Sequence, residues 1–110
     1  MVCFSIKIVK FTRFLKMEQK EYILADQLLR SGTSIGANIE EGISAQSKND
    51  FIAKLSVSLK EANESYYWLR LIEATNTFSD DQVNLLIRDC EELIAMLTAI
   101  LRTSRINQSK

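Results

Sequence analysis

The side chains that could do chemistry in this chain are carboxylates, hydroxyls and thiols, because the sequence contains no histidine. Glu40, Glu41, Glu61 and Glu64 would form a carboxylate metal site if they faced inward from several helices. Di-iron bundles, however, also use Glu-x-x-His pairs. The missing histidine therefore favours surface pairs with lysine or contacts with a neighbouring subunit, each surface pair contributing about 0.2–0.5 kcal/mol. A small divalent-cation-dependent hydrolase or nuclease that uses surface carboxylates is the alternative hypothesis.

The candidate nucleophiles have no recognisable base beside them. Ser31, Ser34 and Ser56 occur without the histidine or lysine arrangement that activates a serine. Cys3 and Cys90 are far apart and form no CxxC pair, so neither a zinc site nor a redox motif is indicated. We expect both thiols to be reduced and partly buried. The sequence thus predicts no catalytic residue, no metal and no cofactor.

Length and composition indicate one helical domain. A chain of 110 residues and 12.6 kDa closes a single core, which places the whole of residues 1–110 in one domain. The chain has no proline and only three glycines. This scarcity disfavours all-β folds, whose turns commonly need both residues. Charged residues interrupt the apolar start, and no apolar run approaches the roughly 18 residues of a membrane span. We therefore expect a cytoplasmic protein without a membrane partner.

Apolar residues at spacings of three and four predict four amphipathic helices, over residues 3–16, 20–41, 48–75 and 80–102. Gly42 is expected to stop the second helix, and Ser47 to cap the third through the backbone N–H of Asp50. Ser79 and Gln82 have the spacing of a capping box before the fourth helix. In the third helix the expected inward stripe is Phe51, Leu55, Leu59, Ala62, Tyr66 and Leu69. Short connections then favour an all-α, antiparallel up-down-up-down four-helix bundle.

Residues 31–38 form a poor helical sequence, since each of two glycines costs about 1 kcal/mol relative to alanine. Gly32 and Gly36 stand four apart and would make a shallow groove for another helix. Ser31 and Asn38 share a stripe with apolar residues, so their polar groups should hydrogen-bond across helices if they are interior. On this interpretation, small residues set the spacing and register of the helices.

Two other interpretations of this segment remain open. Residues 32–42 could form a loop that cradles phosphate through backbone N–H groups. The glycine spacing, however, matches neither GxxxxGK[ST] nor GxGxxG, and residues 31–47 contain no lysine or arginine. The same segment could instead be a contact surface between subunits.

The amino-acid sequence around this segment resembles the bacterial four-helix-bundle family of 23S rRNA intervening-sequence proteins. The most specific part is the pattern Arg-Ser-x-x-Ser-Ile-x-x-Asn-Ile-x-Glu-Gly, carried here by Arg30, Ser31, Ser34, Ile35, Asn38, Ile39, Glu41 and Gly42. The resemblance extends over nearly the whole chain. It implies a ring-shaped homopentamer without catalytic activity. A relative, the accessory variability protein of diversity-generating retroelements, is thought to bind nucleic acid and a reverse transcriptase.

The charge of this chain departs from that strongly basic relative, because 14 basic residues offset 14 acidic ones. The charge is nevertheless segregated, with a net +3 over residues 1–30, −6 over residues 31–97 and +3 over residues 98–110. In an antiparallel bundle one end would then collect Lys7, Lys10, Arg102, Arg105 and Lys110. Repeated around a ring, this basic end would attract RNA or DNA. The alternative is that these are solvated termini that keep the protein soluble.

Three successive aromatic residues, Tyr66, Tyr67 and Trp68, point in different directions around the third helix. They cannot all enter the core of one subunit, so at least one ring should face a partner. Aromatic residues are enriched at subunit interfaces, and stacking on nucleic-acid bases is the alternative. The function that the sequence predicts is a non-enzymatic, self-associating scaffold or interaction module, acting on nucleic acid or a nucleic-acid enzyme through its basic end.

Overall fold

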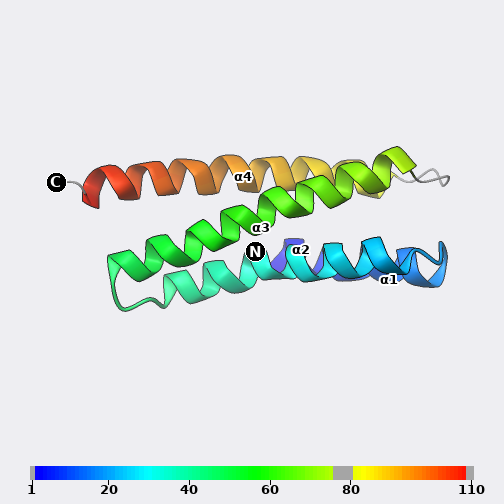
Figure 1. Cartoon of the computed structure of the whole chain (residues 1–110), viewed down its shortest axis with the longest axis horizontal. Coiled ribbons are helices and arrows are strands. Elements are labelled where there is room, and N and C mark those ends of the chain that lie inside the picture. The colour runs from blue at the N-terminus through cyan, green and yellow to red at the C-terminus, as the bar shows by residue number, and fades with distance from the viewer. Residues whose placement is uncertain (1, 76–80, 109–110) are drawn as a thin grey trace.

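The computed structural model describes residues 2–75 and 81–108, which form four α-helices. These are α1 (Val2–Met17), α2 (Tyr22–Ile43), α3 (Lys48–Thr75) and α4 (Asp81–Gln108). Successive helices run in opposite directions (Figure 1). The expected all-α four-helix bundle is therefore confirmed, and the described helix ends lie within a few residues of the predicted ones, except at the end of α4. The expected capping box at Ser79 and the start of the last helix at residue 80 lie outside the described residues.

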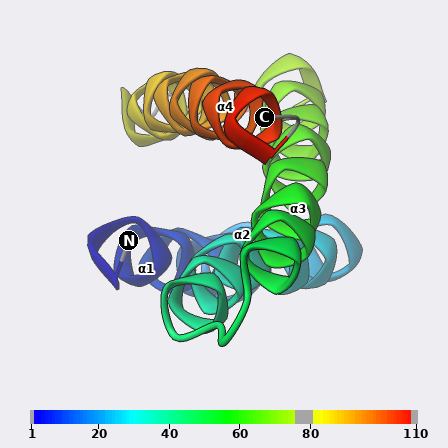
Figure 2. The same ribbon diagram turned by 90° about the vertical axis from the view of Figure 1, so that its left-hand side faces the viewer.

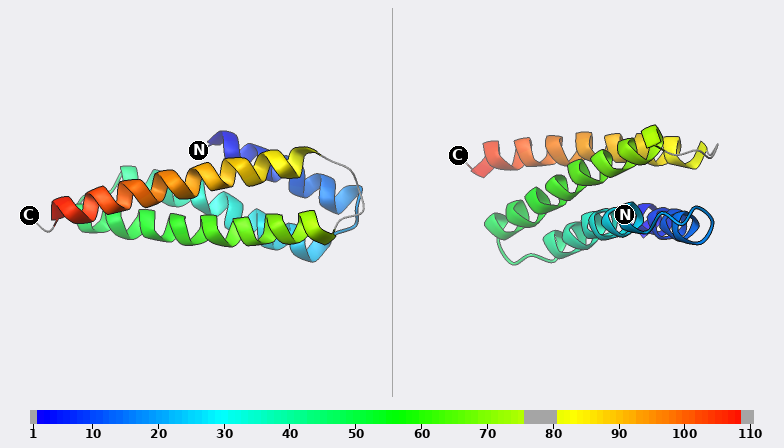
Figure 3. Two further views of the ribbon diagram at one scale, coloured as in Figure 1. Left: turned by 90° about the horizontal axis from the view of Figure 1, so that it is seen from above. Right: turned by 45° about the vertical axis from the view of Figure 1, so that its right-hand side comes forward.

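The helices differ in length, and this difference shapes the bundle. α1 has 16 residues, whereas α3 and α4 have 28 each. At about 1.5 Å per residue, α1 spans about 24 Å and the two long helices about 42 Å. The molecule measures 52 × 20 × 20 Å, so α1 accompanies only part of it (Figure 3). At the other end, three helices continue without α1.

Adjacent helices occupy the corners of the bundle, with α3 linking the α1–α2 side to α4 (Figure 2). The contact of α2 with α3 is the most extensive, and that of α1 with α4 is the smallest of the four helix pairs that touch. The apolar core runs along all four helices. Its largest fully buried side chains are Phe11, Ile8, Leu15, Leu28, Ile35, Leu69, Ile72, Leu86, Leu97 and Leu101.

The inward face of α3 is narrower than the sequence pattern suggests. Leu55, Ala62 and Leu69 are buried as expected, but Leu59 and Tyr66 are only half-buried at its edge. The serines Ser58 and Ser65, both 0% exposed, occupy the centre instead. α3 therefore presents small side chains to its neighbours, which allows their backbones to come close.

The start of α3 agrees with the sequence-based prediction, whereas the end of α2 does not. The backbone N–H of Asp50 donates to the Ser47 Oγ at 3.1 Å, which confirms Ser47 as the cap of α3. The expectation that Gly42 stops α2 is wrong, because Gly42 is helical and the helix ends at Ile43. A Cβ atom at Gly42 would lie 2.5 Å from the Leu55 Cδ1. This glycine therefore makes room for a core side chain of α3.

Gly32 has a similar role on the side of α2 that faces α1. A Cβ atom built there would lie 2.9 Å and 3.0 Å from two side-chain carbons of Ile8. Ile8 is fully buried, and its β-branched side chain has little rotamer freedom in a helix. The missing side chain of Gly32 is thus a notch that receives Ile8 and fixes the distance between α1 and α2.

Replacing Gly32 by leucine should destabilise the fold by about 1–3 kcal/mol, because the notch is already filled and overpacking displaces α1. The gain in helix propensity of about 1 kcal/mol offsets only part of this cost. Chemical denaturation measures the change. Ala53→Leu, at an exposed position of α3, is the control and should stay within about 0.5 kcal/mol of the parent. Equal stability of Gly32→Leu and the control would contradict a filled notch.

Candidate interaction site

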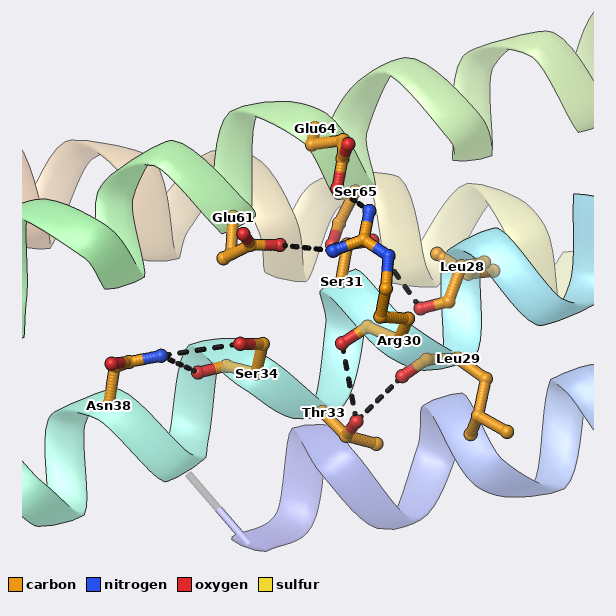
Figure 4. Close-up of polar contacts among 10 residues, drawn as sticks. All are labelled: Leu28, Leu29, Arg30, Ser31, Thr33, Ser34, Asn38, Glu61, Glu64 and Ser65. Atoms are coloured by element: carbon orange, nitrogen blue, oxygen red, sulfur yellow. Dashed lines mark hydrogen bonds and ion pairs between the residues drawn. The ribbon is translucent and has the colours of Figure 1, made fainter.

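The eight residues of the Arg30–Gly42 pattern lie on α2 and divide between two environments. Ser31, Ile35, Ile39 and Gly42 are buried towards the other helices. Arg30 and Glu41 are exposed, and Ser34 and Asn38 are half-buried. Figure 4 shows four polar members of the pattern, Arg30, Ser31, Ser34 and Asn38, along one stretch of α2, with α3 above it in this view. The pattern therefore serves both the packing of α2 and its outer contacts with α3.

Two buried hydroxyl contacts join α2 to α3. The Ser65 Oγ donates to the Ser31 Oγ at 2.8 Å, and both residues are 0% exposed. The Ser31 Oγ lies 3.5 Å from the Leu28 carbonyl oxygen, to which it donates (Figure 4). The second contact lies one turn after Ser31 on α2 and two turns before Ser65 on α3. There the Ser58 Oγ donates to the Ile35 carbonyl oxygen at 2.8 Å. The expected cross-helix bond of Ser31 is confirmed, while its partner Ser65 and the second contact of Ser58 were not anticipated.

Asn38 behaves differently from the expectation. Its Nδ2 donates to the Ser34 carbonyl oxygen at 2.8 Å and to the Ser34 Oγ at 3.2 Å. Both acceptors lie one turn earlier on the same helix (Figure 4). The expected cross-helix bond of Asn38 is therefore wrong: a half-buried amide reaches an acceptor on its own helix, so it does not need one on another.

Ion pairs connect the outer edges of α2 and α3. The Arg30 Nη1 lies 3.1 Å from the Glu61 Oε2, and the Arg30 Nη2 contacts Glu64 (Figure 4). The hydrogen bond with Glu64 raises the pKa of Arg30. The Lys54 Nζ lies 3.1 Å from the Glu41 Oε2, and this hydrogen bond raises the pKa of Lys54. Such exposed pairs contribute about 0–1 kcal/mol each.

These pairs also bear on the carboxylate hypothesis. Glu61 and Glu64 both pair with the same guanidinium group, so each carboxylate already has a cationic partner within the chain. Within residues 2–75 and 81–108, no group of three or more potential ligands is placed to hold a metal ion. The four glutamates of the sequence-based hypothesis are thus not brought together as one site.

The expected basic end is wrong in its geometry. The Lys7 Nζ pairs with the Asp89 Oδ2 at 3.1 Å. Asp89 precedes Arg102 by 13 residues, about 20 Å along α4. Arg105 donates from its Nη2 to the Ser56 Oγ of α3 at 3.2 Å. Because α1 is short, its first residues lie beside the middle of α4.

Lys7 and Lys10 therefore do not share an end with Arg102 and Arg105. Lys110, the fifth member of the expected basic end, lies outside the described residues. The phosphate-loop interpretation of residues 32–42 is also wrong. This segment lies inside α2, where helical bonds use the backbone N–H groups.

Of the three aromatic residues, one ring is left facing outward. The Tyr66 hydroxyl accepts from the Arg70 Nη1 at 2.9 Å, and the guanidinium carbon lies 5.6 Å from the centre of the Tyr66 ring. Trp68 packs against the core, although its Nε1 has no hydrogen-bond partner among the residues that the structure describes. Tyr67 is 59% exposed and meets Trp68 edge to face. Tyr67 is therefore the member available to a partner.

An apolar groove of about 410 Å³ lies between the outer faces of α1 and α2. Its walls are Val2, Ser5, Ile6, Val9, Lys10 and Arg13 from α1 and Gly36, Ala37 and Glu40 from α2. Val2 is 61% exposed and Ile6 48% exposed. Lys10 and Arg13 are exposed and take part in no ion pair with the described residues. This groove was not predicted from the sequence, where its signal is the stripe of Val2, Ile6 and Val9 beside the buried stripe of α1.

A family model described as 23S rRNA-intervening sequence protein matches residues 2–99. The chain belongs to this family. The predicted resemblance is thereby confirmed, and the Arg30–Gly42 pattern that carried it lies within the matched range.

The solved structures similar to this member of the 23S rRNA-intervening sequence family include one with a high sequence identity. It is the crystal structure of a protein with unknown function from the S23 ribosomal protein family, from Bacteroides thetaiotaomicron VPI-5482. The two chains are 46% identical, and the match covers 91% of this chain and 93% of the other, with a TM-score of 0.86. No curated protein matches the chain significantly. None of the helices, as far as the chain is described, has the length and apolarity needed to cross a membrane.

For this family member, a double-mutant cycle on Ser31 and Ser65 tests the buried hydroxyl contact. Ser65→Ala leaves the Ser31 hydroxyl with a single long contact, which should cost about 1–3 kcal/mol of folding free energy. Ser31→Ala should cost a similar amount. The double alanine variant should cost less than the sum, with a coupling of about 0.5–3 kcal/mol. Strict additivity in urea denaturation would mean that the two hydroxyls do not interact.

The two thiols should react very differently. Cys90 is fully buried against the Ala62 carbonyl, and burial raises its pKa to about 12, whereas Cys3 is exposed. The expectation of two partly buried thiols is corrected accordingly. Because the folded pKa exceeds the unfolded one, the protonated thiol stabilises the fold below about pH 9, and this contribution is lost towards pH 12.

With iodoacetamide at pH 8, mass spectrometry should therefore find Cys90 unmodified in the folded protein. It should be alkylated only after denaturant is added, because the reactive species is the thiolate. Cys3 in the same sample provides the internal comparison. Rapid alkylation of Cys90 in the native protein would show that this part of α4 is not packed as described.

Proposed function

We propose that this protein is a non-catalytic scaffold that works by binding copies of itself. The observation that carries the proposal is the apolar groove between α1 and α2, which leaves Val2 and Ile6 in contact with water. Monomeric proteins rarely expose continuous apolar surface unless it has a partner. The assembly that we propose is a ring of five copies, as the family resemblance implies.

Several further exposed apolar side chains support self-association. Leu85 is 56% exposed and Met96 42% exposed on α4, and Tyr67 is exposed on α3. Single exposed apolar residues are ordinary on protein surfaces. Here, however, they occur on α3 and α4 in addition to the exposed apolar residues of α1, in a chain of 110 residues. An assembly in which each copy has two neighbours would cover faces on more than one helix.

The chemistry of the described side chains supports a non-catalytic role. The Ser31 hydroxyl is buried in a contact with α3, the Cys90 thiol is buried and protonated, and Glu61 and Glu64 face Arg30. None of these groups lines the groove. A contact with RNA or DNA has weaker support than self-association, because Lys7 and Lys16 of α1 are already in ion pairs with Asp89 and Asp26.

Static light scattering coupled to size-exclusion chromatography tests this proposal. Because the monomer weighs 12.6 kDa, a ring of five should weigh about 63 kDa. Dilution into the nanomolar range, followed by mass photometry or sedimentation, measures how tightly the copies associate. A mass of 12.6 kDa at tens of micromolar protein, with full helical circular dichroism, would refute self-association.

A further inference from the structure

One stripe of α4 carries two exposed apolar side chains, and part of this stripe borders a small groove that α4 shares with the start of α1. Leu85, Glu92 and Met96 stand seven and four residues apart, so they share one stripe of the helix. Leu85 and Met96 are 56% and 42% exposed, and Glu92 is exposed without an ion pair to the described residues. We call these three residues the α4 ridge. It is an apolar strip with an acidic centre.

The surface that fits this ridge best is the groove on the α1–α2 side. From Val2 to Arg13 the groove follows 11 helical steps, about 16 Å, and the ridge from Leu85 to Met96 follows the same number. The groove supplies apolar walls and two unpaired cations, Lys10 and Arg13. The ridge supplies two apolar side chains and one unpaired carboxylate. Length, apolar character and charge therefore agree.

The charges of whole helices point the same way. α1 contains four basic residues and no acidic one. The first 16 residues of α4, from 81 to 96, contain four acidic residues and one arginine. Within one copy these helices already meet through the pair of Lys7 with Asp89. Complementary charge of this kind steers two surfaces towards each other and disfavours the wrong pairings.

We infer that the α1–α2 groove of one copy binds the α4 ridge of a second copy. This inference rests on the proposed self-association and names the two faces that carry it. If the grooves of two copies met each other, Lys10 and Arg13 of both copies would lie close together. Their repulsion would be offset only by one Glu40 from each copy. A contact between two different faces leaves one free groove and one free ridge at the ends of every pair. Such heterologous contacts close into a ring or continue as a filament.

Two variants separate the faces. The groove variant carries Val2→Gln and Ile6→Gln, and the ridge variant carries Leu85→Gln and Met96→Gln. Glutamine keeps helix propensity while removing the apolar surface. Each variant alone should have the monomer mass of 12.6 kDa. Mixed in equal amounts, they should form one heterodimer of about 25 kDa, because one intact groove meets one intact ridge.

The control is Val57→Gln, which alters an exposed apolar residue of α3 outside both faces and should keep the mass of the parent. If the ridge variant alone assembles like the parent, the inferred pairing is wrong while self-association stands. If the parent itself has a mass of 12.6 kDa, both the inference and the proposed function are wrong. Circular dichroism confirms that each variant is helical.

A crosslinking experiment does not depend on the glutamine variants. In a Cys3→Ser background, chains with Ile6→Cys and chains with Leu85→Cys are mixed and oxidised. Cys90 is buried and does not interfere. A disulfide-linked heterodimer in the mixture, with little covalent homodimer from either chain alone, supports the pairing. Homodimers of the Ile6→Cys chain, without a heterodimer in the mixture, overturn it.

Discussion

The structure depends on the close contact between α2 and α3, in which small polar side chains replace large apolar ones. Ser31 and Ser65 meet hydroxyl to hydroxyl at 2.8 Å, and Ser58 reaches the backbone of α2 at Ile35. A buried hydroxyl without a partner costs about 1–3 kcal/mol, so these bonds permit only one register of the two helices. Gly42 adds a third point of close approach, opposite Leu55. Spacing and register are thus set by the same few residues.

The other two helices are positioned by the same kind of contact. α1 is held where Ile8 enters the notch left by Gly32, and α4 where the Cys90 Sγ approaches the Ala62 carbonyl at 3.2 Å. Because α1 is short and anchored on this side, its outer stripe with Val2 and Ile6 is not covered by the chain itself. The apolar groove is therefore a consequence of the packing. The self-association that we propose would use this groove, whose geometry the small residues impose.

Much of the fold could be predicted because apolar spacing and the lack of proline both favour helices. The errors arose where a pattern has two physical meanings. Ser58 and Ser65 look like surface residues in a periodicity analysis, so Leu59 and Tyr66 were assigned to the core instead. Gly42 looks like a helix stop, whereas its role is to leave space for the Leu55 side chain. These two roles of a glycine can be told apart only when the position of the neighbouring helix is known.

The interaction site was predicted less well, because the helices differ in length. The basic end was inferred from the antiparallel order of the helices alone, as if they were equally long, but α1 reaches only the middle of α4. The family was identified correctly from the Arg30 pattern, yet the pairing of Arg30 with Glu61 and Glu64 required the fold. The groove was missed because its walls come from two helices.

Native-state amide hydrogen exchange tests the central claim most directly, because it reports how firmly each helix is held. If buried small residues lock α2 against α3, the amides of residues 31–42 and 58–65 should exchange only through global unfolding. They should be as slow as those around Leu69 and Leu97 in the core. Exchange of residues 31–42 that is faster by orders of magnitude would show a loosely held segment and contradict the account.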